Sequence, residues 1–213
     1  MKLALDFFRL LLYNIGSDGM NGGMGTGMKR LMIASDIHGS AYWCDRLLNA
    51  FVTVGADRLL LLGDILYHGP RNDLPDGYEP KRVIAMLNPL ADRLFCVRGN
   101  CDAEVDQMVL DFPVLADYAV WPVGDRLLYA THGHKFNTKT PPPLSPGDCL
   151  LHGHTHIPAW EPFGGDGSNL YLNPGSVSIP KAGSPHAYMT LDMITHEIVW
   201  QDLNAGAFHS LTL

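Results

Sequence analysis

Five short polar clusters, each placed directly after an apolar run, carry residue types that bind metal ions. In chain order they are Asp36-x-His38, Gly63-Asp64, Gly99-Asn100, His132-Gly133-His134 and Gly153-His154-Thr155-His156. Carboxylate and amide oxygens are hard ligands and imidazole nitrogens are borderline ones, so together they suit first-row divalent ions such as Mn, Fe or Zn. The repeated position after apolar segments predicts a metal site assembled from distant parts of the chain.

The spacing within two of these clusters favours joint binding of one ion. On an extended backbone, side chains two positions apart point to the same side. This holds for Asp36 and His38, and again for the two histidines of the last cluster. A single buried histidine is usually a structural residue, and we interpret three others in that way: His186, His196 and His209. Because Asp and His are rarely buried without a partner, five such clusters indicate function rather than packing alone.

The elements that must position the first three clusters alternate between strand and helix. Continuous apolar runs at 30–35, 58–62 and 94–97 predict buried strands. Apolar residues at helical spacing predict helices over 41–54 and 80–90. Strands in this order form a parallel sheet through right-handed crossovers. Ligands gather beyond the carboxyl ends of such strands, which is where the first three clusters stand.

From residue 118 onward the pattern changes to short strands separated by turns. We expect these strands at 118–121, 126–130, 149–151, 170–172, 188–191 and 198–200. No long helical pattern interrupts them. Such a half would build mostly a second sheet, packed against the first.

Length and composition are those of a globular protein with a sizeable core. The chain has 213 residues, of which 46% are hydrophobic and 17% charged. Its net charge of −7 argues against strong nucleic-acid binding, which needs a basic stripe. The four cysteines show no paired spacing and indicate a reducing compartment. No apolar run reaches the ~18 residues of a membrane span. The apolar start of the chain is interrupted by Asp6 and Arg9 and has no small-residue cleavage site after it, so we expect no secretion signal and a cytoplasmic protein.

Residues 1–27 look separable from the rest of the chain. Apolar residues at roughly helical spacing near the start are followed by a Gly- and Ser-rich stretch with the composition of a linker. Two interpretations stay open: an extension upstream of a start at Met28, which we favour, and a partner-binding helix on a tether. In either case we expect one domain over residues 28–213.

The five clusters resemble, in order, the signature blocks of the calcineurin-like metallophosphoesterase superfamily. Those blocks read Asp-x-His, Gly-Asp, Gly-Asn-(His/Cys)-(Asp/Glu), His and Gly-His-x-His, and the resemblance extends over about residues 28–205. Two stretches are also similar to the small YfcE-like (MJ-type) phosphodiesterase branch: Arg98-Gly99-Asn100-Cys101-Asp102 and Asn173-Pro174-Gly175-Ser176. The resemblance implies an α/β (α+β) fold, a four-layer αββα sandwich of two mixed β-sheets flanked by helices. A dinuclear metal site would lie at the carboxyl ends of the strands.

The resemblance also implies which residues hold two divalent ions. One ion would be held by Asp36, His38, Asp64 and His156, and the other by Asp64, Asn100, His132 and His154, with Asp64 bridging. Two cations ~3.5–4 Å apart can share a hydroxide that attacks phosphorus in line with the leaving alkoxide. We therefore expect a phosphoric diester hydrolase for a small phosphodiester. Mn²⁺ is the preferred metal, with Zn²⁺, Fe²⁺, Ni²⁺ and Co²⁺ as alternatives.

Cys101 departs from much of the superfamily, which has a histidine there to assist the leaving oxygen. A thiol is a weak hydrogen-bond donor, so we expect a preference for diesters with good leaving groups. The alternative is that Cys101 is only a small buried residue. The candidate catalytic residues are Asp64, Asn100 and Cys101.

Loops next to the clusters offer candidate substrate contacts. Three residues are singled out: His68, Arg71 and His134. His152 directly precedes the last cluster and is expected to face the core or to support a metal ligand. Recognition of the substrate should depend on loops 67–78 and 136–146.

Two other functions compete with the two-metal phosphodiesterase. The first is a non-catalytic scaffold on the same fold, as in the retromer subunit that resembles this family; loss of ligands would favour it, and all seven ligand positions are kept here. The second is a single-zinc hydrolase, which would leave Asp64 and Asn100 without a role. The family resemblance is also compatible with a homo-oligomer.

Overall fold

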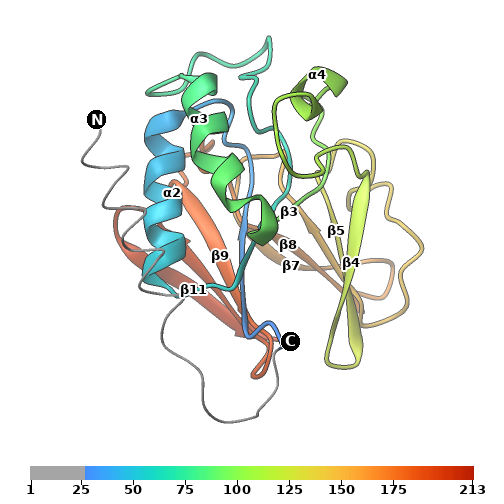
Figure 1. Cartoon of the computed structure of the whole chain (residues 1–213). Coiled ribbons are helices and arrows are strands. Elements are labelled where there is room, and N and C mark those ends of the chain that lie inside the picture. The colour runs from blue at the N-terminus through green and yellow to red at the C-terminus, as the bar shows by residue number, and fades with distance from the viewer. Residues whose placement is uncertain (1–26) are drawn as a thin grey trace, which may run out of the picture.

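The computed structural model describes residues 27–213 (Figure 1). Both interpretations of the N-terminal segment concern residues outside this part. The first half of the described chain alternates strands and helices, and the second half consists of strands. None of the helices in residues 27–213 combines the length and apolar character that crossing a membrane requires.

The first half forms the strands and helices that the sequence predicts. They are β1 (Arg30–Ala34), α2 (Ala41–Thr53), β2 (Arg58–Leu61), α3 (Pro80–Leu87) and β3 (Leu94–Cys96). The three strands pair in parallel, with β2 in the middle. Helix α3 is shorter than predicted because Pro89 has no N–H to continue it, and a 3₁₀ helix, η1 (Asn88–Arg93), follows. A short helix that was not predicted, α4 (Glu104–Gln107), comes after β3.

The second half builds the whole second sheet, as expected, and it also contributes strands to the first. Three of its strands extend the first sheet: β9 (Ala187–Asp192), β10 (Glu197–Asp202) and β11 (Gly206–Thr212). They join it because β9 pairs antiparallel with β1. The first sheet is therefore mixed, in the order β11-β10-β9-β1-β2-β3. Strand β1 lies inside it, which explains why residues 31–34 are all buried.

The second sheet is also mixed. Its strands are β4 (Tyr118–Val123), β5 (Arg126–Thr131), β6 (Cys149–His152), β7 (Ala159–Phe163) and β8 (Asn169–Asn173). Their order is β4-β5-β6-β8-β7. The central strands β5, β6 and β8 are parallel, and the edge strands β4 and β7 are antiparallel to their neighbours. The clusters that follow β5 and β6 therefore leave the sheet at the same edge.

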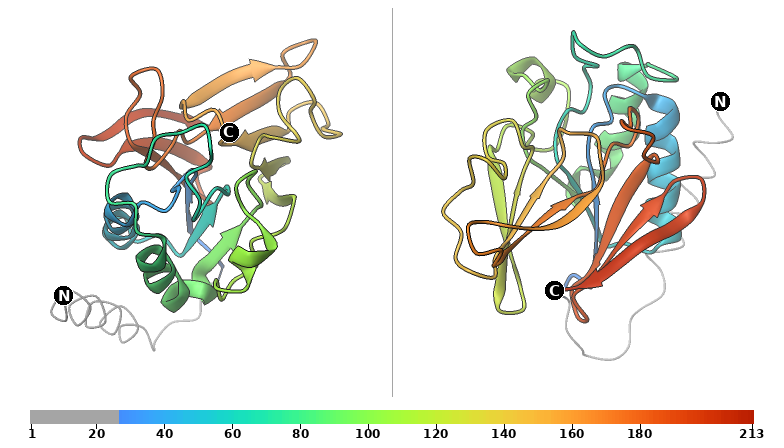
Figure 2. Two further views of the ribbon diagram at one scale, coloured as in Figure 1. Left: turned by 90° about the horizontal axis from the view of Figure 1, so that it is seen from above. Right: turned by 180° about the vertical axis from the view of Figure 1, so that it is seen from behind.

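The two sheets pack face to face, and α2 and α3 cover the outer face of the first sheet (Figure 2). Strand β1 contributes to both layers of apolar core: Leu31 and Ile33 pack towards the second sheet, and Met32 and Ala34 towards the helices. The α/β class and the two mixed sheets are thereby confirmed. Within residues 27–213 every element after α4 is a strand. In place of a helix on the outer face of the second sheet, Phe136 packs there against Tyr129.

Candidate metal centre

The carboxyl ends of strands from both sheets meet at one edge of the molecule, and the five polar clusters lie there. Asp36, Asp64 and Asn100 come after β1, β2 and β3, while His132 and His154 come after β5 and β6. Five of the seven predicted ligands are buried: Asp36, His38, Asp64, His132 and His156. His154 is partly buried and Asn100 is exposed.

The first group of ligand atoms comes from Asp36, His38 and His156. His156 Nε2 lies 3.3 Å from Asp36 Oδ1, and His38 Nε2 lies 3.6 Å from the same oxygen. The two Nε2 atoms are 3.4 Å apart. One oxygen and two nitrogens therefore converge closely enough to hold a single cation.

The second group comes from Asn100, His132 and His154. His132 Nε2 lies 3.0 Å from Asn100 Oδ1 and 3.1 Å from His154 Nδ1. An amide oxygen and two ring nitrogens therefore gather at a second point, built on the ends of β3, β5 and β6.

Asp64 stands between the two groups. Its Oδ2 is 3.6 Å from His38 Nε2 and 3.4 Å from His132 Nε2. Its other oxygen, Oδ1, accepts a hydrogen bond from the Cys101 amide at 2.7 Å. One oxygen thus faces both groups while the other is fixed, which is the arrangement a bridging carboxylate needs.

Backbone carbonyls fix the orientation of three of the imidazole rings. The Nδ1 atoms of His38, His132 and His156 lie 2.8, 2.7 and 2.6 Å from the carbonyl oxygens of Tyr67, Leu62 and Ile179. A carbonyl can only accept a hydrogen bond, so each Nδ1 carries the proton and donates. Each Nε2 then turns its lone pair towards the centre, as in histidines that bind metal through Nε2.

The donor atoms of this centre fit metal cations. The facing Nε2 lone pairs of His38 and His156 repel each other unless positive charge stands between them. Asp36 Oδ1 is buried and has no hydrogen-bond partner in the described part of the chain. A carboxylate oxygen in that state is costly, and a metal ion would satisfy it.

The electrostatics of the metal-free site point the same way. Burial alone would lower the pKa of His132, but the carboxylates of Asp64 and Asp36 outweigh it and raise the pKa to about 9. Burial alone would raise the pKa of Asp36, yet His156 and His38 hold it well below its usual range. The centre therefore attracts positive charge, and protons take the place of metal ions when none is bound.

The backbone at the candidate ligands is strained. Seven non-glycine residues in 27–213 have a positive φ, and five are candidate ligands: Asp36 (60°), His38 (49°), Asp64 (56°), His154 (65°) and His156 (62°). Each such conformation costs on the order of 1 kcal/mol or more and persists only where surrounding contacts hold it. These backbone conformations turn the chain sharply after each strand, so that the candidate ligands point towards the centre.

Two glycines let separate clusters approach each other. A Cβ on Gly99 would overlap the backbone nitrogen and Oδ1 of Asp64. A Cβ on Gly153 would overlap the Ser35 side chain and come within 2.8 Å of Asp36 Oδ2. Only glycine fits at these positions because a side chain there would displace a candidate ligand.

Asp102 is a supporting residue whose role the sequence did not reveal. Its Oδ2 accepts hydrogen bonds from the amides of Asp64 at 2.8 Å and Gly99 at 2.7 Å, and its Oδ1 accepts from Ile65 at 2.9 Å. The buried carboxylate therefore joins the ends of β2 and β3 beneath Asp64. Its place inside the third block was the only signal in the sequence.

The turn at 173–178 supports the other side of the centre. The hydroxyls of Ser176 and Ser178 donate to the Asp36 carbonyl at 3.0 and 2.9 Å. The amide of Asn173 donates to the Gly153 carbonyl at 3.0 Å. In the sequence this turn stands out by its resemblance alone, and the structure shows that it holds the backbone of the first and last clusters.

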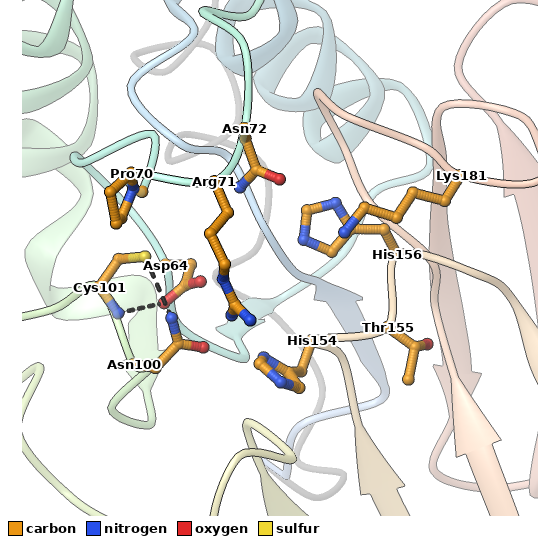
Figure 3. A pocket seen from close by; sticks show the side chains of 11 residues that line it. Asp64, Pro70, Arg71, Asn72, Asn100, Cys101, His154, Thr155, His156 and Lys181 are labelled. Carbon is orange, nitrogen blue, oxygen red and sulfur yellow. Dashed lines mark hydrogen bonds between the residues drawn. The ribbon is translucent and has the colours of Figure 1, made fainter.

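A cavity of about 450 Å³ opens over the centre (Figure 3). Its lining includes Arg71, one of the three predicted substrate contacts, but neither His68 nor His134. His68 packs between the rings of Tyr67 and Tyr78, and His134 lies against His132. The lining also includes Asn72 and Lys181, which the sequence did not single out because isolated polar residues in loops carry no signal.

Cys101 and His152 take different positions relative to this cavity. Cys101 is partly exposed on its wall, and its Sγ accepts a hydrogen bond from the Asn100 amide at 3.2 Å. Burial and the charge of Asp64 raise the pKa of the Cys101 thiol, so it is neutral at pH 7. His152 is buried outside the cavity lining and stacks on Tyr171. It therefore faces the core, which is one of the two positions that the sequence predicts for it.

Comparison with known proteins identifies relatives over most of the chain. Residues 28–196 match the calcineurin-like phosphoesterase superfamily domain. Phosphodiesterase YfcE of Escherichia coli K12 is 48% identical over 165 residues, which is 78% of this chain and 88% of that protein. The solved structure of the Escherichia coli YfcE phosphoesterase superposes with a TM-score of 0.80 at 44% identity, covering 86% of this chain and 98% of that one.

A more distant structure shares the fold alone. Vps29 of Entamoeba histolytica, solved in complex with Zn²⁺, has a TM-score of 0.52 at 20% identity and covers 85% of this chain and 97% of that one. The family match spans most of the described chain, and the 48% identical relative agrees with it. The chain therefore belongs to the calcineurin-like phosphoesterase superfamily.

Proposed function

We propose that this protein is a two-metal phosphodiesterase. The observation that carries the proposal is the position of Asp64, whose Oδ2 faces both ligand groups at 3.6 and 3.4 Å. Two-metal enzymes of phosphoryl transfer clamp the reacting group between ions that stand about 3.5–4 Å apart. The 48% identical relative carries the name of a phosphodiesterase, which supports a diester as the substrate.

The proposed ligands divide into two sets that share Asp64. The first set adds Asp36, His38 and His156, and the second adds Asn100, His132 and His154. When bound, the two ions supply a hydroxide nucleophile at neutral pH and neutralise charge on the phosphoryl oxygens during in-line displacement. Asn100 contributes a neutral oxygen, which keeps the total ligand charge low enough for an anionic substrate to add.

Cys101 is proposed to lie beside the leaving group. Its thiol stays protonated at neutral pH because burial and Asp64 raise its pKa. A neutral thiol is a weak donor, so the site gives little help to a poor leaving group. Diesters whose leaving group departs without a proton suit it best.

The remaining parts of the proposal concern context. We propose one phosphoesterase domain over 28–213, Mn²⁺ as the preferred metal, a cytoplasmic location and assembly as a homo-oligomer. The segment before Met28 is proposed to be an extension outside that domain. Support for the domain comes from the family match over 28–196.

The test is hydrolysis of bis-p-nitrophenyl phosphate by protein stripped with EDTA and then reloaded with Mn²⁺. We expect turnover that disappears with EDTA, returns with Mn²⁺ and is absent in Asp64→Asn. Asp125→Asn is the matched control, because Asp125 is exposed in the β4–β5 turn, at the opposite end of β5 from His132. A correctly folded, metal-loaded wild type without turnover would refute the proposal in favour of a scaffold.

A further inference from the structure

Two cationic side chains that are not proposed metal ligands line the cavity, and they come from two different loops. Arg71 comes from the loop between β2 and α3, and Lys181 comes from the loop between β8 and β9. Figure 3 shows Arg71 pointing into the cavity between Asp64 and His154, and Lys181 extending beside His156. Residues from two separate loops thus bring positive charge to one opening in a protein whose net charge is −7.

Hydrogen bonds fix both loops to the centre. The Lys181 amide donates to the His156 carbonyl at 3.1 Å, and the Ser184 hydroxyl donates to the Lys181 carbonyl at 2.7 Å. On the other side, His38 Nδ1 donates to the Tyr67 carbonyl of the β2–α3 loop at 2.8 Å. The side-chain amide of Asn72 donates to the His68 carbonyl at 2.8 Å and closes the turn that carries Arg71. The backbone of each cation is therefore held in place relative to the cavity.

Neither cation has an anionic partner among the described residues. Within residues 27–213, the ion pairs of Lys and Arg involve Arg30, Arg82, Arg98 and Lys135. The side chains of Arg71 and Lys181 make no hydrogen bond there either. Two unpaired cations on loops of fixed backbone are therefore available to an anionic ligand at the cavity.

The charge balance of the centre indicates whether these cations are needed by the reacting phosphate or can bind another group of the substrate. Two divalent ions would bring four positive charges, and the carboxylates of the proposed ligands Asp36 and Asp64 would offset two of them. A hydroxide and the single negative charge of a phosphodiester would offset the other two. The ligand set would thus balance the charge of the reacting group, which leaves the charges of Arg71 and Lys181 for another group.

We propose that Arg71 and Lys181 bind a second phosphate group of the substrate, so that the enzyme prefers diesters that also carry a phosphomonoester. This inference rests on the proposed phosphodiesterase function and extends it. A phosphomonoester carries a charge of about −1.5 to −2 at pH 7, which matches the two cations. A cavity of about 450 Å³ falls in the range of ~300–1,000 Å³ that holds whole small-molecule ligands, so it has room for more than one phosphate.

The experiment compares two substrates that differ only in the second phosphate. One is thymidine 5′-(p-nitrophenyl phosphate), and the other is the same diester with an added 3′-phosphate. Because the leaving group is the same, the ratio of their kcat/KM values isolates the contribution of the added phosphate. We expect the Mn²⁺-loaded wild type to prefer the 3′-phosphorylated diester by at least about tenfold. The preference should shrink at high salt, since the cations are exposed.

Arg71→Ala and Lys181→Ala, singly and together, test the two residues by this ratio rather than by total activity. We expect each single variant to lower the ratio and the double variant to bring it near one. Lys81→Ala is the control, because Lys81 is an exposed lysine outside the cavity lining and its loss changes the net charge equally. Calorimetric binding of thymidine 3′,5′-bisphosphate and thymidine 5′-monophosphate gives a second readout that requires no turnover.

The outcomes separate this inference from the function on which it rests. A wild type that hydrolyses both diesters at equal kcat/KM would overturn the second-phosphate proposal and leave the phosphodiesterase intact. The second-phosphate proposal would also be overturned if the Arg71→Ala/Lys181→Ala double variant kept the wild-type preference for the 3′-phosphorylated diester. Absence of turnover on every diester would instead refute the phosphodiesterase itself.

Discussion

The carboxylate of Asp102 accepts a hydrogen bond from the backbone amide of Asp64 at 2.8 Å, although 38 positions separate the two residues. The same carboxylate accepts the amides of Ile65 and Gly99. It therefore joins the ends of two parallel strands directly beneath the residue proposed to bridge two metal ions. Its negative charge lies outside both proposed ligand sets.

Asp102→Asn should destabilise the protein by about 1–3 kcal/mol. Both carboxylate oxygens accept backbone amides, so the NH₂ group of asparagine would face at least one N–H donor in either orientation. Urea unfolding gives the free energy of unfolding for this variant, with Asp125→Asn as the matched surface control. Equal stability of Asp102→Asn and the control would contradict the supporting role.

Gly99→Ala should lower phosphodiesterase activity by about 100-fold or more, because a methyl group there overlaps Asp64 and must displace it. Gly165→Ala is a suitable control, since a Cβ at Gly165 meets no atom within 4 Å. Both kcat/KM and the amount of bound Mn²⁺ would be measured for each variant. Equal kcat/KM and equal bound Mn²⁺ in the two variants would show that the close packing of Gly99 against Asp64 is unimportant.

The metal-free protein should be most stable near pH 6.5. The folded pKa of His132 is about 9 against an ordinary 6.5, so its stabilisation is complete below pH 6.5 and is lost as the pH rises towards 9. That loss is on the order of 3 kcal/mol. Burial lowers the pKa values of His152 and His154 to about 4, so their contribution is present above pH 6.5 and is lost as the pH falls towards 4.

Urea unfolding of EDTA-treated protein at about pH 5, 6.5 and 9 measures this dependence. His132→Gln removes the group that titrates on the alkaline side, and stability between pH 6.5 and 9 should then change little. A metal-free wild type that becomes steadily more stable from pH 6.5 to 9 would be inconsistent with a protonated His132.

The strands and helices of the first half could be predicted because each is a local pattern. The continuous apolar run at 58–62 appears as the buried strand β2, and helical spacing after residue 40 appears as α2. Strands β7 and β11 carry no such pattern. They are edge strands whose residues are mostly exposed. Pro162 lies within β7, and Gly206 is the first residue of β11.

The partners of the strands could not be predicted from local patterns. Nothing in residues 187–192 distinguishes a strand of the first sheet from one of the second, because that choice depends on which surface β9 covers. The same limit applies at the centre. Spacing indicated that Asp36 and His38 act together, but only tertiary contacts place Lys181 beside His156 and Asp102 beneath Asp64.

The most direct test of the account is the number of metal ions bound per chain. Elemental analysis of Mn²⁺-loaded, gel-filtered protein should find two ions per chain in the wild type. Asp64→Ala should remain folded by circular dichroism, bind one ion or none and lose activity. One ion per wild-type chain, or two ions and near-native turnover in Asp64→Ala, would contradict a centre in which this carboxylate joins two metal sites.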